Sequence, residues 1–164
     1  MNKFIQIIFI SLVLSCTYLN AQSMFLLTKI QKAYLVVENY SEKIPMSLKE
    51  DIYDEMRYVT DELKIDTQGY SFRTFGFMIN DTKIAGKEIL TIELILAEEV
   101  TRLDDKEDVY AITFQKKNYI DATNKDNEEL SEELMDNVDL LLNDFKEQYK
   151  EDNEEWNYYY YHHF

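Results

Sequence analysis

The chain has 164 residues, with 32 acidic and 17 basic side chains and a formal net charge of −15. This acidic balance argues against nucleic-acid binding, which needs a basic surface to displace counterions, and against contact with anionic lipid headgroups. The chain is long enough for one domain, and its 46% of hydrophobic residues can supply a core for that domain.

The first 21 residues have the three-part pattern of an export signal. Lys3 is the only charge, an apolar run extends from Phe4 to Leu14, and the segment ends at the small residue Ala21. A membrane-spanning helix needs about 20 apolar residues, more than this run provides. We predict a signal peptide over 1–21. Its Asn-Ala-Gln ending is typical of one group of Gram-negative bacteria, which predicts a location in the periplasm or cell envelope.

The only cysteine, Cys16, leaves a second processing route open. Val13 to Cys16 has the pattern of a lipobox, in which the cysteine is acylated and anchors the protein, here to the outer membrane. Leu14 is bulkier than the residue usual at its position, so we favour cleavage after Ala21. The mature chain then has no cysteine and a net charge of −16, because residues 1–21 hold one lysine and no acid. Membrane contact is expected only if Cys16 is lipidated.

The first elements after the signal are a strand and a helix. A β-rich segment predicts a buried strand from about 32 to 39, although the spacing of its apolar residues leaves a helix open. A helix is predicted over 47–64, where Ser47 and Glu50 have the spacing of a capping box. Its apolar residues recur every three or four positions and form one stripe: Ile52, Met56, Val59 and Leu63.

Three strands follow, because the apolar period changes to two. Alternation puts Phe75, Phe77 and Ile79 on one face of the first strand and Tyr110, Ile112 and Phe114 on one face of the third. In the second strand, Leu90, Ile92, Leu94 and Leu96 are the better core face, because the other face carries Glu93. Polar turns at 80–82 and 104–106 separate the strands. Because these connections are short, consecutive strands are expected to pair antiparallel.

The last predicted helix covers residues 127–150. Asp126 and Glu129 form a second capping pair, and Lys146 and Lys150 lie at the end that the helix dipole favours for cations. The apolar residues again form one stripe: Leu130, Leu134, Val138, Leu141, Phe145 and Tyr149.

Together these elements predict an α+β fold: a small antiparallel sheet of three to four strands covered on one face by two amphipathic helices. This coarse order is similar to that of small envelope lipoproteins that assist outer-membrane assembly, a similarity of fold only. We predict a single domain over 22–150, followed by an acidic-to-aromatic tail over 151–164.

Catalytic motifs are missing from the sequence. Histidine occurs only at His162 and His163, and no nucleophile elbow, zinc-protease motif or phosphate loop is present. Glu93 is the best candidate for a perturbed carboxylate, although strand alternation places it on the solvent side. A run that begins at Asp121 resembles an EF-hand loop, but Lys125 stands where that loop has an oxygen ligand for Ca²⁺. We therefore predict no enzyme, no cofactor and no metal.

Two features point to a partner. Residues 126–155 contain 13 acids and two lysines, which favours a solvated helix face or a docking surface for a basic protein. The tail ends in a run of aromatic residues suited to partner binding: Trp156, Tyr158, Tyr159, Tyr160, Tyr161 and Phe164. The tail is interpreted as an added strand, a lid over the sheet or an exposed recognition segment, and packing on its own domain is favoured.

The function predicted from the sequence is protein–protein binding by an exported, non-catalytic bacterial cell-envelope protein, as an accessory or assembly factor. One alternative is an acidic inhibitor or immunity-type protein that occludes a basic partner. Another is a carrier of an apolar ligand between sheet and helices, in a pocket lined by Phe72, Phe75, Phe77 and Leu94. The oligomeric state and the identity of the partner are left open.

Overall fold

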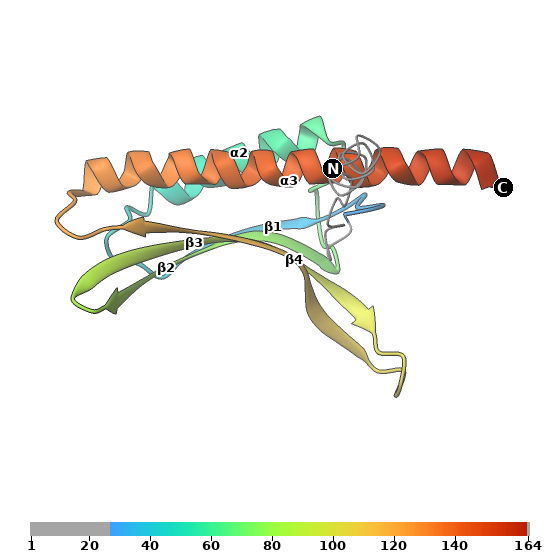
Figure 1. Ribbon diagram of the computed structural model, residues 1–164, viewed down its shortest axis with the longest axis horizontal. Coiled ribbons are helices and arrows are strands. Elements are labelled where there is room, and N and C mark those ends of the chain that lie inside the picture. The colour runs from blue at the N-terminus through green and yellow to red at the C-terminus, as the bar shows by residue number, and fades with distance from the viewer. Residues whose placement is uncertain (1–26, 164) are drawn as a thin grey trace, which may run out of the picture.

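The computed structural model describes residues 27–163, with side chains through Glu154. Its elements are β1 (Tyr34–Asn39), α2 (Leu48–Glu62), β2 (Arg73–Ile84), β3 (Lys87–Thr101), β4 (Asp108–Asp121) and α3 (Asn127–His163). The four strands form one sheet in the order β1-β2-β3-β4, and both helices lie on the same face of it (Figure 1). The predicted α+β fold is confirmed. The predicted signal peptide and Cys16 lie outside the described residues.

The sheet is mixed, whereas the sequence predicted an antiparallel one. β2 pairs antiparallel with β3, and β3 with β4, as expected. β1 instead pairs parallel with β2, with Tyr34 opposite Thr74 and Asn39 opposite Ile79. The reason is that α2 spans the connection between β1 and β2 and returns the chain to the same end of the sheet, the usual way of joining parallel neighbours.

The core lies between the sheet and the two helices. Both predicted helix stripes are buried, apart from partly buried Tyr149, and so are the predicted inward faces of β2 and β3. Phe145 of α3 is the centre of an aromatic cluster: its ring centroid lies 4.4 Å from that of Phe75 and 5.4 Å from that of Phe114. These contacts fix α3 across β2, β3 and β4.

The two helices begin in different ways. At α3 the cap forms as predicted, because the Asp126 carboxylate accepts the backbone N–H groups of Glu128 at 2.9 Å and Glu129 at 3.0 Å. The capping box predicted at Ser47 does not form: Ser47 has helical backbone angles and its side chain makes no capping bond. A turn that starts at Pro45 already supplies carbonyl acceptors, and the Glu50 N–H donates to the Ser47 carbonyl oxygen at 3.1 Å.

This difference predicts unequal costs for two alanine substitutions. Asp126→Ala is expected to lower the free energy of unfolding by about 1 kcal/mol, because two backbone donors lose their acceptor. Ser47→Ala is expected to change it by less than about 0.5 kcal/mol, as for a surface site without a cap. Urea unfolding of both variants measures the difference. Equal losses would show that the Ser47 hydroxyl does cap α2 in solution.

The β3–β4 hairpin bends away from the helices and projects from the domain (Figure 1). The pairing register shifts between Leu96, which faces Phe114, and Ala97, which faces Ile112. This bulge reverses the alternation of side chains along β4. Phe114 is buried, but Ile112 is half exposed and Tyr110 is exposed, so the prediction that all three share one face was wrong.

The last helix is longer than predicted. α3 runs without a break from Asn127 to His163, past the predicted end at 150 and through the segment interpreted as a tail. In Figure 1 it extends beyond the edge of the sheet. The interpretation of this segment as an added strand was therefore wrong. Within residues 27–163, no helix is long and apolar enough to cross a membrane.

Candidate protein-binding surface

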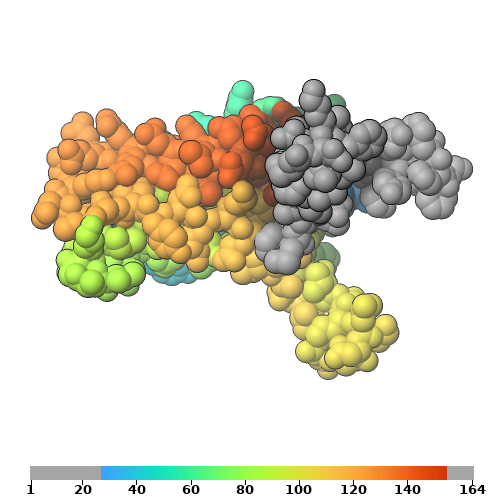
Figure 2. All heavy atoms as spheres, in the orientation of Figure 1, coloured from blue at the N-terminus to red at the C-terminus, as the bar shows by residue number. Residues whose placement is uncertain are grey.

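The face of the sheet opposite the helices carries a group of exposed apolar side chains at the base of the projecting hairpin. We call it the hairpin patch: Tyr70, Phe72, Tyr110 and Ile112, which are 71%, 57%, 60% and 50% exposed. Figure 2 shows the hairpin as a separate lobe below the body of the molecule. Large side chains with this exposure, fixed on a sheet, are typical of interaction surfaces.

The patch is held together by contacts across three segments. The Tyr70 and Phe72 rings meet edge to face, with centroids 5.2 Å apart. The Glu99 N–H donates to the Phe72 carbonyl oxygen at 3.3 Å, and Glu99 pairs with Tyr110 across the β3–β4 ladder. Hydrogen bonding to Tyr70 raises the pKa of Tyr110, and burial and nearby Glu99 add to the effect. The patch is thus preorganised around Glu99.

Glu99 is the charged centre of the patch. It is exposed and, among the described residues, takes part in no salt bridge, whereas its neighbour Glu98 pairs with Arg73. A shallow hollow of about 360 Å³ lies beside Glu99, and its lining also includes Phe72, Lys32 and Arg73. A carboxylate beside aromatic rings is a combination that binds an ammonium or guanidinium group.

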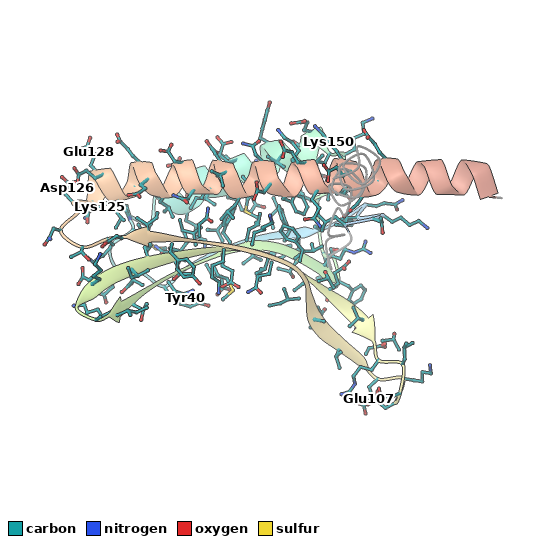
Figure 3. The ribbon with its side chains drawn as sticks, viewed as in Figure 1. Tyr40, Glu107, Lys125, Asp126, Glu128 and Lys150 are labelled. Atoms are coloured by element: carbon teal, nitrogen blue, oxygen red, sulfur yellow. The ribbon has the colours of Figure 1, made fainter. Side chains whose placement is uncertain are left out.

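The projecting hairpin adds negative charge around this centre. Residues 98–108 hold six acids and two cations, a net charge of −4. Arg102 is already engaged, because its guanidinium contacts Asp105 at 2.5 Å and Glu107 at 2.8 Å. Glu107 lies at the tip of the hairpin (Figure 3). The hairpin therefore presents an acidic surface next to the apolar patch, which favours a cationic partner.

The two acidic candidates from the sequence, Glu93 and the EF-hand-like run from Asp121, lie away from the hairpin patch and are paired with lysines. Glu93 contacts Lys117 at 3.1 Å and accepts a hydrogen bond from Gln115, so this carboxylate is paired on the uncovered face. Asp121, at the start of the EF-hand-like run, contacts Lys87 at 2.8 Å, and this ion pair, together with Thr123, lowers its pKa. Within the described residues, no three potential metal ligands gather at one point.

The pocket imagined for an apolar ligand is filled by protein. Phe75, Phe77 and Leu94 are at most 1% exposed and belong to the closed core, where the Phe145 ring lies against Phe75. Phe72 is on the opposite face of the sheet from them. The aromatic residues predicted to bind a partner, Trp156, Tyr158 to Tyr161 and Phe164, lie outside the residues whose side chains are described.

The acidic side of α3 is largely open. Glu128, Glu132, Asp136 and Asp139 are exposed, and Glu128 and Asp126 mark the acidic start of the helix in Figure 3. Farther along, cations of α3 bind α2: Lys150 contacts Glu62 at 2.8 Å and Lys146 contacts the same carboxylate at 3.3 Å, which lowers the pKa of Glu62.

The hairpin patch was not predicted from the sequence. Strict alternation put Tyr110 and Ile112 on the same face as Phe114, and Glu99 was one acid among many. A signal that was present is the pair Tyr70 and Phe72, because strict alternation from Phe75 and Phe77 puts even-numbered residues on the opposite face. The bulge that turns Tyr110 and Ile112 outward has no marker in the local sequence, since neither glycine nor proline occurs there.

The chain was compared with known proteins. No family model and no curated protein matches it. Among solved structures it is similar to a minor lipoprotein from Acinetobacter baumannii, at 11% sequence identity and a TM-score of 0.38. The match covers 73% of this chain and 91% of that chain. A likeness of this size says nothing about function.

Proposed function

We propose that this chain is an exported, non-catalytic cell-envelope protein of a Gram-negative bacterium that binds another protein through the hairpin patch. Export is supported by the signal pattern of residues 1–21. Binding is supported by one observation above all: the Glu99 carboxylate, without a salt-bridge partner in the described structure, stands among exposed aromatic rings. An accessory or assembly role fits an exposed patch of this kind, which is suited to contact with the surface of another protein.

The partner is expected to present a lysine or arginine next to apolar residues. The cation binds Glu99 and the faces of Phe72 and Tyr110, while its apolar neighbours cover Ile112. The net charge of the chain and of the hairpin steers such a partner to this side. Because these contacts are charged, binding is expected to weaken as salt is raised.

The test is affinity capture from envelope extract with the native chain and matched variants as baits. Glu99→Lys is expected to reduce the specifically captured protein about tenfold or more, because a charge-assisted contact becomes a repulsive one. Phe72→Ala is expected to reduce it as well. Two controls lie on α2, away from the patch: Glu55→Lys, and Tyr58→Ala, whose ring is 67% exposed. Both are expected to capture normally.

Equal capture by native, Glu99→Lys and Glu55→Lys baits would contradict the proposal. A bait that ends before Trp156 tests the aromatic end of α3 separately. Loss of capture with that bait alone would place the binding site there and not at the hairpin patch.

A second candidate is an acidic inhibitor of a basic protein, favoured by the exposed carboxylates of α3. Asp136→Lys with Asp139→Lys removes this charge without touching the patch. If these substitutions abolish capture while Glu99→Lys does not, the inhibitor function is the better explanation.

A further inference from the structure

The projecting part of the β3–β4 hairpin is a ribbon of two strands (Figure 1). Within the described part of the chain, β2 begins at Arg73, opposite Glu98, so residues 99–101 of β3 pair with β4 alone. The other edge of the ribbon is formed by residues 108–112 of β4, the last strand of the sheet. Two strands by themselves are only marginally stable in water, and a third strand adds stability. A third strand beside residues 108–112 would therefore stabilise the ribbon.

Two hydrogen bonds give the direction of the backbone groups in the ribbon. The Arg102 N–H donates across the ribbon to the Glu107 carbonyl oxygen at 2.9 Å, whereas the Glu99 N–H donates in the opposite direction, to Phe72 at 3.3 Å. Residue pairs that bond to each other alternate along an antiparallel ladder with pairs that do not. Glu99 is opposite Tyr110, so in this pair the backbone groups point away from each other.

The outward backbone groups on the β4 side belong to exposed residues. By the same alternation they are the N–H and C=O groups of Asp108, Tyr110 and Ile112. Asp108 is exposed, and Tyr110 and Ile112 are 60% and 50% exposed. Val109 and Ala111 between them are partly exposed as well, so neither face of this length lies in the core. Residues 108–112 thus offer an accessible edge with three consecutive outward positions.

The rest of β4 is protected against pairing with another strand. Lys116 contacts Asp144 of α3 at 3.2 Å, and the Asn118 side chain donates to that of Asn137 of α3 at 3.0 Å. Lysine on an edge and a helix that covers it are devices that keep an edge strand single. Residues 108–112, with the sequence Asp-Val-Tyr-Ala-Ile, contain no lysine, proline or glycine. The part of β4 that is open to pairing is therefore the part beside the hairpin patch.

We propose that the partner adds an extended segment to this edge, antiparallel to residues 108–112 of β4, a mode of binding that rests on the proposed function of the hairpin patch. Asp108, Tyr110 and Ile112 each exchange two backbone hydrogen bonds with the partner residue directly opposite. Antiparallel pairing is favoured because it is more stable per residue than parallel pairing. The ribbon then has three strands, and the partner is held by its backbone as well as by its side chains.

The side chains of the ribbon define the sequence of that segment. Partner residues opposite Asp108, Tyr110 and Ile112 place their side chains on the face that carries the hairpin patch. A cation opposite Tyr110 is two strands away from Glu99. Because neighbouring strands are about 4.8 Å apart, a lysine or arginine there reaches the carboxylate across the Tyr110 ring. A second cation faces Asp108 and an apolar residue faces Ile112, so the segment has the pattern apolar-x-cation-x-cation.

A second copy of this chain is a poor occupant of the same edge. Residues 98–108 of each copy carry a net charge of −4, so pairing of ribbon with ribbon brings like charges together. The charge of the ribbon is instead complementary to a cationic segment. The occupant is therefore a different protein, with lysine or arginine at alternate positions of an extended segment.

The test is titration calorimetry of the purified chain with synthetic peptides. The probe is acetyl-Thr-Val-Thr-Arg-Thr-Lys-Thr-amide, in which valine, arginine and lysine are placed to face Ile112, Tyr110 and Asp108. The reversed sequence has the same composition and charge, and it is expected to bind about threefold more weakly or worse, because it matches these residues only in parallel pairing. Tighter binding of the reversed peptide would overturn the antiparallel arrangement.

Methylation of the peptide backbone separates strand addition from contact by side chains alone. Methyl groups on the amides of valine and arginine remove N–H donors that point at β4, and the dissociation constant is expected to rise about tenfold or more. Methyl groups on the two threonine amides that precede and follow arginine remove N–H donors that point away, and this matched control is expected to bind normally. Equal affinities of the two methylated peptides would overturn strand addition.

The two proposals fail in different ways. If the methylated peptides bind equally but Glu99→Lys abolishes the binding of both, strand addition is wrong and the hairpin patch still binds a cation. If the unmodified peptide does not bind at all, strand addition is wrong too, and capture from envelope extract by native and Glu99→Lys baits decides the proposed function separately.

Amide hydrogen exchange of the whole chain locates the added strand. The Tyr110 and Ile112 N–H groups point outward, so we expect them to exchange fast in the free chain and at least about tenfold more slowly when the peptide is saturating. The Val109 N–H, which bonds within the ladder, is the control and should be protected in both states. Protection of Tyr110 and Ile112 in the free chain would show that a second copy or the chain itself occupies the edge, and would overturn the proposal.

Discussion

Replacement of Phe145 by alanine is expected to lower the free energy of unfolding by about 3–5 kcal/mol, the range found for large aromatic side chains in cores. Phe145 is 1% exposed, and its ring joins Phe75 of β2, Phe114 of β4 and Tyr149 of its own helix. Alanine leaves a cavity where α3 crosses the sheet. Whole domains are stable by only about 5–15 kcal/mol, so this variant is expected to be close to unfolding.

Urea unfolding followed by circular dichroism measures the effect. Phe145→Leu fills much of the cavity and is expected to cost less than the alanine variant. Leu140→Ala is the matched control on the same helix, because Leu140 is 55% exposed, and it should change stability by less than about 0.5 kcal/mol. A loss below about 1 kcal/mol for Phe145→Ala would mean that α3 does not close the core through this ring.

The second large effect is expected where the start of the described chain is tied to α3. The Leu27 N–H donates to the Asp152 carboxylate at 2.6 Å, and Asn153 donates to the Leu27 carbonyl oxygen at 3.0 Å. Leu27 itself is fully buried. The double variant Asp152→Ala/Asn153→Ala leaves both backbone groups of Leu27 without these partners. Its free energy of unfolding is expected to fall by about 2–4 kcal/mol, because each unsatisfied buried polar group costs about 1–3 kcal/mol.

Glu151→Ala provides the control for this pair, because Glu151 is exposed on the same turn. Asp152→Asn keeps an acceptor and removes the charge, so it should lose less than the alanine variant. Amide hydrogen exchange gives a second readout, since the Leu27 N–H is expected to lose its protection in the double variant alone. If the double variant and Glu151→Ala are equally stable, the contact does not hold the two segments together.

Much of the fold could be predicted because its determinants are local. The stripe from Leu130 to Phe145 and the alternation through Phe75, Phe77 and Ile79 both reflect burial on one face. The parallel pairing of β1 could not be predicted in this way, because it depends on the path of α2 over the sheet. Ser47 shows the same limit, since a capping pattern is not needed where a preceding turn already supplies the acceptors.

The candidate site was predicted less well than the fold. The expectation of partner binding rested on the acidic residues of 126–155 and on the aromatic residues from Trp156 to Phe164, and neither stretch belongs to the hairpin patch around Glu99. The position of the patch residues depends on a one-residue shift in pairing between β3 and β4, which brings together residues distant in sequence. Composition identifies the chemistry of such a surface, whereas the sheet register decides which residues form it.

The bulge at Leu96 and Ala97 also divides the β3–β4 hairpin into a part that is constrained by folding and a part that is not. On one side of it, residues such as Phe114 pack in the core, and most substitutions there affect folding. On the other side, from 98 to 111, the hairpin projects from the body and its larger side chains are mostly exposed. The hairpin can therefore change length or composition between related proteins without loss of the domain. Divergence of partner choice should be concentrated there.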